Sequence, residues 1–301
     1  MYHGIINVYK EKGFTSHDVV AKMRGICGQK KIGHTGTLDP DAEGVLPICL
    51  GKATKVCDML TDSDKIYRAV MLLGVETDTQ DMTGEILQQK STSDLTEKMV
   101  RETVASFTGT ISQVPPMYSA LKVNGKKLYD LARAGVTVER KAREITIHQI
   151  EIEEVTFPRV QMTIHCSKGT YIRTLCHDIG QKLGCGAAME SLVRLQAAGY
   201  RLEEAFRLKE LQCLKDTGEL YTAVQPVENV FSEYPALQVK DEADRLLKNG
   251  NALSVRQFIS VPENAYHSPV RVYDISGKFC AVYEYRKEKT VFCPMKMFLE
   301  D

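Results

Sequence analysis

The chain of 301 residues has no tryptophan, no net charge and no long apolar run. The lack of any stretch of roughly 20 apolar residues argues against a transmembrane helix. Residues 1–14 lack a basic segment followed by an apolar one, so we expect no signal peptide and a cytoplasmic protein. With 39 basic and 39 acidic residues, the overall charge gives no reason to expect a nucleic-acid partner, although a neutral chain can still sort its charges into faces.

Several common catalytic motifs are also missing. No G-x-G-x-x-G, G-x-S-x-G or H-E-x-x-H occurs, so a dehydrogenase, an α/β-hydrolase and a zincin have no sequence support. Residues 44–53 end like a phosphate-binding P-loop, but Leu46 stands where a glycine is required and Ala53 where Ser or Thr is required. We therefore expect no nucleotide cofactor.

The cysteines give no metal site either. There are nine, an odd number, and none belongs to a C-x-x-C pair, which is typical of reduced thiols in a chain without a signal peptide. The one group that resembles a metal site is His165-Cys166 with Cys176-His177. Adjacent strand residues point to opposite faces and adjacent helix residues diverge by about 100°, so four such ligands would need unusual backbone to converge. We expect no metal.

The composition, with 43% hydrophobic and 26% charged residues, is that of a globular protein, and the length suggests about two domains. The sequence predicts strands at 4–9, 45–50, 67–73, 144–154 and 160–166. It predicts helices from an N-cap at Ser16 to Gly28, over 54–60, from an N-cap at Ser93 or Asp94 to about Phe107, and over 171–183. After about residue 232, short strands separated by turn residues predict a small β-barrel.

A glycine-rich loop at 28–44 carries the most suggestive chemistry. Asp39 precedes a proline, which disfavours helix at that position, and the flanking glycines let the backbone approach a ligand closely. This arrangement would present one carboxylate at the mouth of a cleft, with His34 five residues earlier. The alternative is a simple Asp-Pro turn, and spacing alone favours that alternative.

Positive charge is concentrated in an aperiodic segment at about 110–143, which is long for a connector. Residues 119–143 contain seven Lys or Arg residues and two acidic ones, together with tyrosines at 118 and 129. Because cations neutralise phosphates and aromatic rings stack on unpaired bases, the segment favours nucleic-acid binding over a merely solvated surface.

One further cation, Arg173, stands in the first turn of a predicted helix, where the helix dipole favours anions. Pairing with a buried carboxylate would explain that position. An exposed arginine on a surface turn is the simpler interpretation of the residue alone.

Four long segments, taken together, resemble the bacterial tRNA pseudouridine synthase B (TruB) family. They are GHTGTLDPDAEGVLPICLGKATK (33–55), DSDKIYRAVMLLGVETDTQDMTG (62–84), PPMYSALKVNGKKLYDLARAG (115–135) and IHCSKGTYIRTLCHDIGQKLGCGA (164–187). The resemblance runs in register from Gly4 to about Arg194, weakens through 195–232 and returns loosely in a C-terminal segment that looks like a PUA domain. It implies an enzyme that isomerises uridine 55 in the T loop of tRNA, after flipping the base out of its stack.

The resemblance implies roles for individual residues. Asp39 matches the catalytic aspartate, and Arg173 matches the arginine that pairs with it. The other matches are a tyrosine that stacks on the target base (Tyr67), a histidine that fills the space left by the flipped base (His34), and two residues that line the uracil pocket (Tyr171 and Leu192). The basic residues that would bind RNA in the insertion are Lys122, Lys126, Lys127 and Arg133.

The implied fold is α+β, with a catalytic domain over residues 1–232 and a PUA-like β-barrel over 233–301. The catalytic domain would have a mixed, mainly antiparallel sheet and a thumb insertion at about 110–143. No cofactor, metal or obligate protein partner is implied. Two positions depart from the family: Glu11 stands where proline usually follows lysine, and Val193 stands where a basic residue is common.

Other interpretations stay open. A non-catalytic RNA-binding protein would use the thumb and barrel alone, and a hydrolase would use Asp39 with Asp41 or Glu43 as an acid/base pair. A synthase acting on a different uridine is a third alternative. The sequence also leaves open whether Asp39 attacks carbon or acts as a base at the ribose 2′ position.

Overall fold

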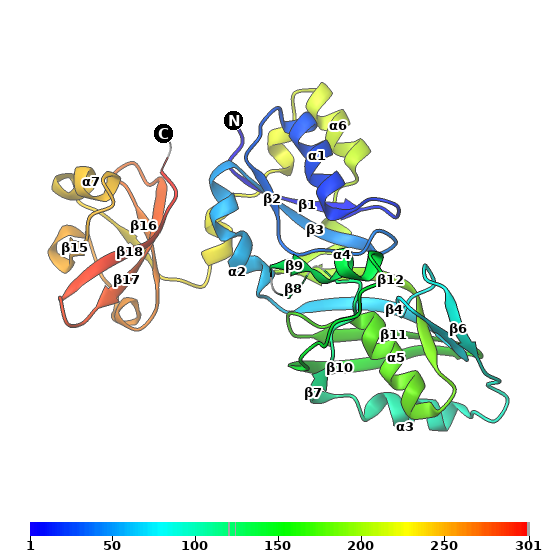
Figure 1. The fold of residues 1–301 in the computed structure, drawn as a ribbon. Coiled ribbons are helices and arrows are strands. Elements are labelled where there is room, and N and C mark those ends of the chain that lie inside the picture. The colour runs from blue at the N-terminus through cyan, green and yellow to red at the C-terminus, as the bar shows by residue number, and fades with distance from the viewer. Residues whose placement is uncertain (120, 124, 300–301) are drawn as a thin grey trace.

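The computed structural model describes residues 1–119, 121–123 and 125–299, and its fold is α+β as predicted (Figure 1). The strands of its large sheet are β1 (Gly4–Lys10), β2 (Ile32–His34), β3 (Glu43–Leu50), β4 (Lys65–Leu73), β7 (Gly109–Gln113), β10 (Arg143–Thr156), β11 (Arg159–Cys166), β12 (Ala187–Ala197) and β13 (Tyr200–Arg201). Seven of them lie in the order β1-β3-β12-β4-β11-β10-β7, with β2 beside β3 and β13 beside β12. Of the described pairings in this sheet, β12 with β3 is parallel and the others are antiparallel, so the mixed, mainly antiparallel sheet is confirmed.

Helices cover the sheet in two groups, each with its own apolar core. The apolar stripes of α3 (Glu97–Ala105) and α5 (Ile172–Leu183) pack on β4, β10 and β11. Those of α1 (Ser16–Cys27) and α6 (Leu208–Asp216) pack on β1 and β3. None of the helices in the described part of the chain is long and apolar enough to cross a membrane.

Shorter elements connect these layers. They are α2 (Cys57–Thr61), the hairpin of β5 (Val75–Thr77) with β6 (Ile86–Gln89), and 3-10 turns at Gly51–Val56, Leu202–Glu204, Leu220–Ala223 and Val227–Phe231. Two more 3-10 turns, Val255–Gln257 and Glu263–Tyr266, lie in the C-terminal part of the chain. The predicted helix at 54–60 is therefore a 3-10 turn followed by the five-residue α2.

Two predicted helix starts are wrong by one to three residues. α1 is capped by Thr15 rather than Ser16, because Thr15 and Asp18 form a reciprocal capping box that leaves Ser16 inside the helix. α3 is capped by Thr96, whose hydroxyl accepts a hydrogen bond from the Met99 amide at 3.3 Å. Neighbouring Ser, Thr and Asp residues cap equally well, so the sequence could not select among them.

The aperiodic segment at 110–143 begins inside the large sheet, because β7 pairs with β10. Beyond β7 it forms a small hairpin, β8 (Lys122–Val123) with β9 (Lys126–Lys127), followed by α4 (Leu128–Arg133). We call residues 114–142 the thumb. In Figure 1 the thumb lies against the middle of the large sheet, beside β12.

The C-terminal strands form a second, five-stranded sheet in the order β14-β16-β17-β18-β15. Its elements are β14 (Ala236–Gln238), α7 (Asp241–Lys248), β15 (Leu253–Ser254), β16 (Val270–Tyr273), β17 (Phe279–Arg286) and β18 (Val291–Met297). It curls around its own apolar core as a PUA-like half-barrel and lies to one side of the large sheet (Figure 1). Val282 and Phe298 belong to one buried apolar cluster with Phe231 and with Ile5 and Val45 of the large sheet, and this cluster ties the two parts together.

Candidate functional site

The loop between β2 and β3 carries Asp39, and buried polar contacts fix its shape. The Lys10 ammonium group, fully buried at the end of β1, donates to the carbonyls of Pro40 (3.0 Å) and Ala42 (2.5 Å). On the other side of Asp39, the Leu38 amide donates to the buried hydroxyl of Ser16 on α1 at 3.0 Å. The backbone on both sides of the carboxylate is therefore anchored to β1 and α1.

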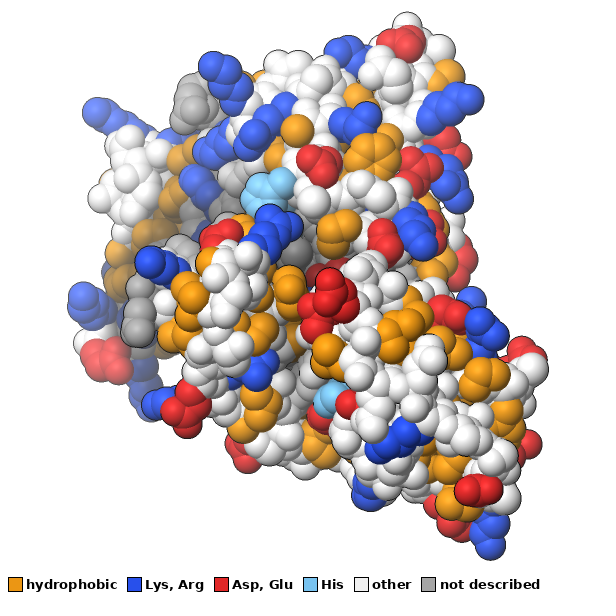
Figure 2. Space-filling view, turned by 45° about the vertical axis from the view of Figure 1, so that its right-hand side comes forward, with side chains coloured by type: hydrophobic (Ala, Val, Ile, Leu, Met, Phe, Trp, Pro, Cys, Tyr) orange, Lys and Arg blue, Asp and Glu red, His pale blue; other side chains and the backbone are white. Residues whose placement is uncertain are grey.

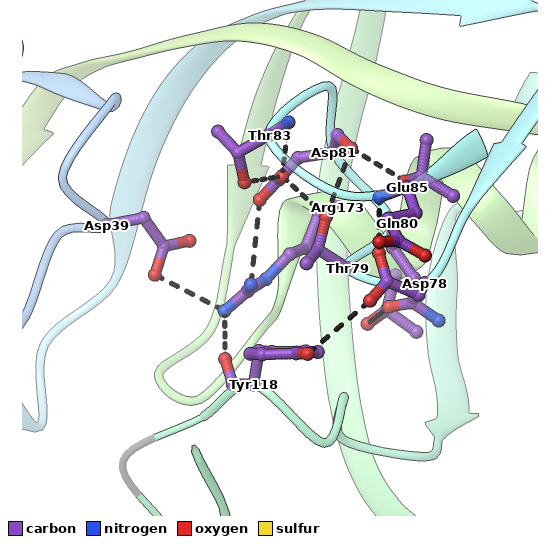
Figure 3. Close-up of polar contacts among 11 residues, drawn as sticks. Asp39, Asp78, Thr79, Gln80, Asp81, Thr83, Glu85, Tyr118 and Arg173 are labelled. Atoms are coloured by element: carbon purple, nitrogen blue, oxygen red, sulfur yellow. Dashed lines mark hydrogen bonds and ion pairs between the residues drawn. The ribbon is translucent and has the colours of Figure 1, made fainter. Parts of the chain in front are cut away.

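Arg173, in the first turn of α5, faces that carboxylate. Its Nη2 donates to Asp39 Oδ1 at 3.2 Å and to the Tyr118 carbonyl at 2.6 Å, while its Nη1 lies 3.6 Å from Asp81 Oδ2. Figure 3 shows the guanidinium group between Asp39 on one side and Asp81 on the other. The Arg173 side chain is only 6% exposed, which excludes the interpretation that it is an exposed arginine on a surface turn. Its carboxylate partners, Asp39 and Asp81, explain its position in the first turn of the helix.

Asp81 is a residue that sequence reasoning did not single out, although it lies in the quoted segment 62–84. Its Oδ1 accepts hydrogen bonds from the Thr79 hydroxyl (2.8 Å), the Thr83 amide (3.0 Å) and the Thr83 hydroxyl (2.5 Å). These donors hold the Asp81 carboxylate in place, and its other oxygen, Oδ2, faces Arg173 (Figure 3). Only the folded chain brings this loop beside α5, so no local pattern could have revealed the pair.

The protonation of Asp39 reflects opposing influences. Burial raises the pKa of its carboxyl group, Arg173 lowers it, Asp81 raises it and Lys10 lowers it. Burial alone would favour the neutral acid, and the two cations favour the carboxylate. Burial outweighs the two cations, so the pKa of Asp39 is raised from its ordinary value, and Arg173 is the larger of the two influences that limit this rise.

Tyr67 lies on β4, and its side chain is buried. Burial raises the pKa of its phenol, and the neighbouring Arg194 guanidinium group opposes the shift. Arg194, on β12 and 1% exposed, donates from Nε to the Val45 carbonyl at 2.7 Å and from Nη2 to the Gly36 carbonyl at 3.4 Å. Arg194 thus holds the backbone at both ends of the Asp39 loop through hydrogen bonds. Its sequence context did not indicate this role.

The other three predicted pocket residues surround these groups. His34 ends β2, and burial lowers the pKa of its imidazole, whose Nδ1 accepts a hydrogen bond from the Gly36 amide at 3.3 Å. Tyr171 is the N-cap residue of α5, and its backbone makes two hydrogen bonds with the Gln113 side chain. The Tyr171 amide donates to Gln113 Oε1 at 2.9 Å, and Gln113 Nε2 donates to the Tyr171 carbonyl at 3.1 Å. Leu192, on β12, is buried in the same apolar cluster as Tyr67.

The thumb contacts the same arginine. The Tyr118 carbonyl receives Arg173 Nη2, and the Tyr118 hydroxyl donates to Asp78 Oδ2 at 3.4 Å. Lys126 on β9 is exposed, and the Arg133 guanidinium group lies over the Tyr129 ring at 5.6 Å. The backbone of Lys122 and Lys127 forms part of β8 and β9, and their side chains lie outside the described ones. The contact of all four basic residues with RNA stays a prediction.

Comparison with known proteins gives the family. Residues 24–172 match the pattern described as "TruB family pseudouridylate synthase (N terminal domain)", and residues 173–232 match "tRNA pseudouridylate synthase B C-terminal domain". The tRNA pseudouridine synthase B of Lachnoclostridium phytofermentans is 52% identical over 308 residues, which cover 99% of this chain and 100% of that protein. The chain belongs to the TruB family. It is a pseudouridine synthase, an enzyme that isomerises uridine to pseudouridine.

More distant members agree with this assignment. The tRNA pseudouridine synthase B of Clostridium acetobutylicum is 46% identical over 277 residues, which cover 92% of this chain and 93% of that protein. A solved structure of a Cbf5-Nop10-Gar1 complex contains a chain with the same fold, at a TM-score of 0.73 and 28% identity over 99% of this chain and 85% of that one. An H/ACA ribonucleoprotein bound to a substrate RNA containing 2′-deoxyuridine has a TM-score of 0.72 at 26% identity, covering 99% and 86%.

The two departures from the TruB pattern have structural explanations. Glu11 forms an ion pair with Arg207 at 2.9 Å, and this arginine stacks over the Tyr9 ring at 4.6 Å. Val193, on β12, pairs with Glu43 of β3, and the neighbouring cation, Arg194, is directed into the site instead.

The described side chains that could converge on a metal ion lie outside the Asp39 site. In the described part of the chain, the His, Cys, Asp and Glu side chains that converge as metal ligands would are Asp64, His148 and His165. None of the three contacts Asp39 or Arg173. The group of His165-Cys166 with Cys176-His177, considered above from the sequence, does not form a metal site. His165 and Cys166 point to opposite faces of β11.

Proposed function

We propose that this TruB-family enzyme converts uridine 55 in the T loop of tRNA to pseudouridine, with ionised Asp39 as the catalytic residue. The observation that carries the proposal is the buried Arg173 guanidinium group held between Asp39 and Asp81. An arginine fixed in this way orients one carboxylate and favours its ionised form. The names of the relatives supply the class of RNA, tRNA.

The chemistry needs only such a carboxylate. The N1–C1′ bond of uridine breaks, the uracil turns, and C5 bonds to C1′; the C5 proton then leaves, and a proton is gained at N1. The isomerisation is redox-neutral, so the expected absence of a cofactor is compatible with it. Asp39 acts either as a nucleophile at carbon or as a base at the ribose 2′ position, and both routes require the ionised form.

The surrounding residues would hold the flipped base. Extruding a stacked uridine costs a few kcal/mol, which contacts in the pocket must offset. Tyr67 would stack on the uracil, Tyr171 and Leu192 would line its pocket, and His34 would occupy the space that the base leaves. The phenol of Tyr67, or a water molecule, would take the C5 proton.

The charge distribution suits an RNA partner despite the zero net charge. Lys and Arg side chains gather on the upper left of the face in Figure 2. We propose that residues 1–232 form the catalytic domain, that the thumb lysines and Arg133 contact phosphates, and that the half-barrel at 233–301 grips another part of the same tRNA. All nine cysteines are free thiols, which suits a reducing cytoplasm.

The test is tritium release from a tRNA T-arm stem-loop labelled at uridine C5. Wild type should release tritium and leave the RNA chain intact, whereas Asp39→Asn should bind the RNA without release. Asp41→Asn is the matched control, because Asp41 is an exposed aspartate two residues away. Release by Asp39→Asn at a rate near that of wild type would overturn the assignment of Asp39. Binding without release by wild type would instead favour an RNA-binding module or a different target uridine, and release of free uracil would favour a hydrolase.

A further inference from the structure

Three polar side chains converge on the face of the large sheet opposite the core that contains Tyr67. Asp64 immediately precedes β4, His148 lies on β10 and His165 lies on β11. Residues 160, 162, 164 and 166 of β11 are buried in the core on one face, so His165 belongs to the other face. The cluster is therefore partly exposed and separate from the Asp39 site.

A β-bulge brings the two imidazoles together. Ile147 pairs with Cys166, but the next paired residue of β10, opposite His165, is Gln149, which leaves His148 as the additional residue. A bulge of this kind bends its strand and redirects a side chain. Here the ring centroids of His148 and His165 come to lie 4.6 Å apart.

The Asp64 carboxylate lies between the nitrogens of both rings. Asp64 Oδ2 is 3.1 Å from His148 Nε2 and 3.9 Å from His165 Nε2, and the ligand atoms of all three residues lie within 4.8 Å of one another. In a tetrahedral zinc site with bonds of about 2.0–2.1 Å, neighbouring ligand atoms are roughly 3.3 Å apart. Asp64 Oδ2 and His148 Nε2 are already close to this spacing. Small rotations of the partly exposed side chains would bring His165 Nε2 to the same distance.

Two lysines on adjoining segments form contacts away from this carboxylate. Lys168 pairs with Asp62 at 2.8 Å, and the Lys65 ammonium group donates to the carbonyls of Thr61 and Ser63. Among the described side chains, the ion-pair contacts of Asp64 are those with the two histidines. The carboxylate is thus available to a cation that the imidazoles could share.

We propose that Asp64, His148 and His165 bind one Zn²⁺ ion, or a divalent cation of similar ligand preference, through Asp64 Oδ2 and the two Nε2 atoms. Two imidazoles and a carboxylate are a ligand set that zinc accepts, and water would fill the open fourth position. The ion would tie the start of β4, three residues before Tyr67, to β10 and β11. This structural site departs from the expectation of no metal, and it is independent of the proposed target uridine.

The test compares four purified full-length proteins, stripped of metal with a chelator and kept reduced: wild type, His148→Ala, His165→Ala and His267→Ala. His267 is the matched control, because it is an exposed histidine 3.9 Å from a carboxylate, that of Glu263, outside the cluster. Zn²⁺ is titrated in competition with a chromophoric zinc indicator. All four proteins keep the same nine thiols, so a difference among them reports on the imidazoles.

Wild type and His267→Ala should bind one equivalent of Zn²⁺ that the other two variants bind at least ~10-fold more weakly, since losing even an outer-shell partner of a metal costs that much. Zn²⁺ should also raise the melting temperature of wild type and His267→Ala but not of the two cluster variants. Each variant's melting temperature without metal shows that it folds. Four superimposable binding curves, or no binding by wild type at micromolar Zn²⁺, would overturn the proposal.

Discussion

The most informative single substitution is Arg173→Lys, because it keeps the positive charge and removes the planar fork. Arg173 reaches Asp39 at 3.2 Å, the Tyr118 carbonyl at 2.6 Å and Asp81 at 3.6 Å. One lysine ammonium group cannot fill the positions of two guanidinium nitrogens that face different carboxylates. The variant therefore loses the orientation of Asp39 even though a cation stays nearby.

The size of the effect follows from these contacts. A buried hydrogen bond to a charged group contributes about 1.5–3 kcal/mol. If one such contact stabilises the transition state, its loss lowers kcat about 10- to 150-fold, since each 1.36 kcal/mol is a factor of ten. The tRNA affinity should stay within about threefold, because the interaction is made to the catalytic group rather than to the RNA.

The assay is single-turnover tritium release with saturating enzyme, together with filter binding of the same RNA. Arg159→Lys is the matched control, because Arg159 also pairs with a carboxylate, Glu190 at 2.8 Å, but its side chain is 55% exposed. That control should stay near wild type. A kcat for Arg173→Lys within threefold of the wild-type value, at unchanged melting temperature, would refute the argument that pairing geometry sets the rate.

Three further predictions concern the frame of the site. Lys10→Met should lower the free energy of unfolding by about 2 kcal/mol or more, because the buried Ala42 carbonyl and the partly buried Pro40 carbonyl lose their donor; an unchanged urea midpoint would contradict this. Because Asp81 raises the pKa of Asp39, Asp81→Asn should move the acid limb of the pH–rate profile to lower pH, and a shift to higher pH would show the sign to be wrong. Gly44→Ala should destabilise the fold by roughly 1–3 kcal/mol or more, since φ is +106° and a Cβ would lie 2.3 Å from a carbonyl oxygen of β12. The control Gly25→Ala, with open space around it, should not lower the melting temperature in a thermal unfolding experiment.

Local patterns were sufficient for much of the fold. The alternation of buried and exposed residues in β4 and β11 marks them as strands with one face in the core, and the left-handed Gly28 and Gly184 end α1 and α5 where the sequence places them. The predictions that failed depended on choices between near-equal neighbours, such as Thr15 and Ser16 as caps. Such choices differ by less free energy than tertiary contacts supply.

The sequence by itself determined which chemical groups are present: an aspartate that precedes a proline in a glycine-rich loop, and an arginine placed against its helix dipole. A family resemblance links the two. The tertiary structure decided which groups meet. Asp81 lies beside Arg173 only in the folded chain. Arg194 supports the Asp39 loop because β12 lies next to β3, and His148 contacts His165 because β10 lies next to β11. Residues far apart in the chain acquire a shared electrostatic environment only when the sheet forms, and no local spacing encodes that proximity.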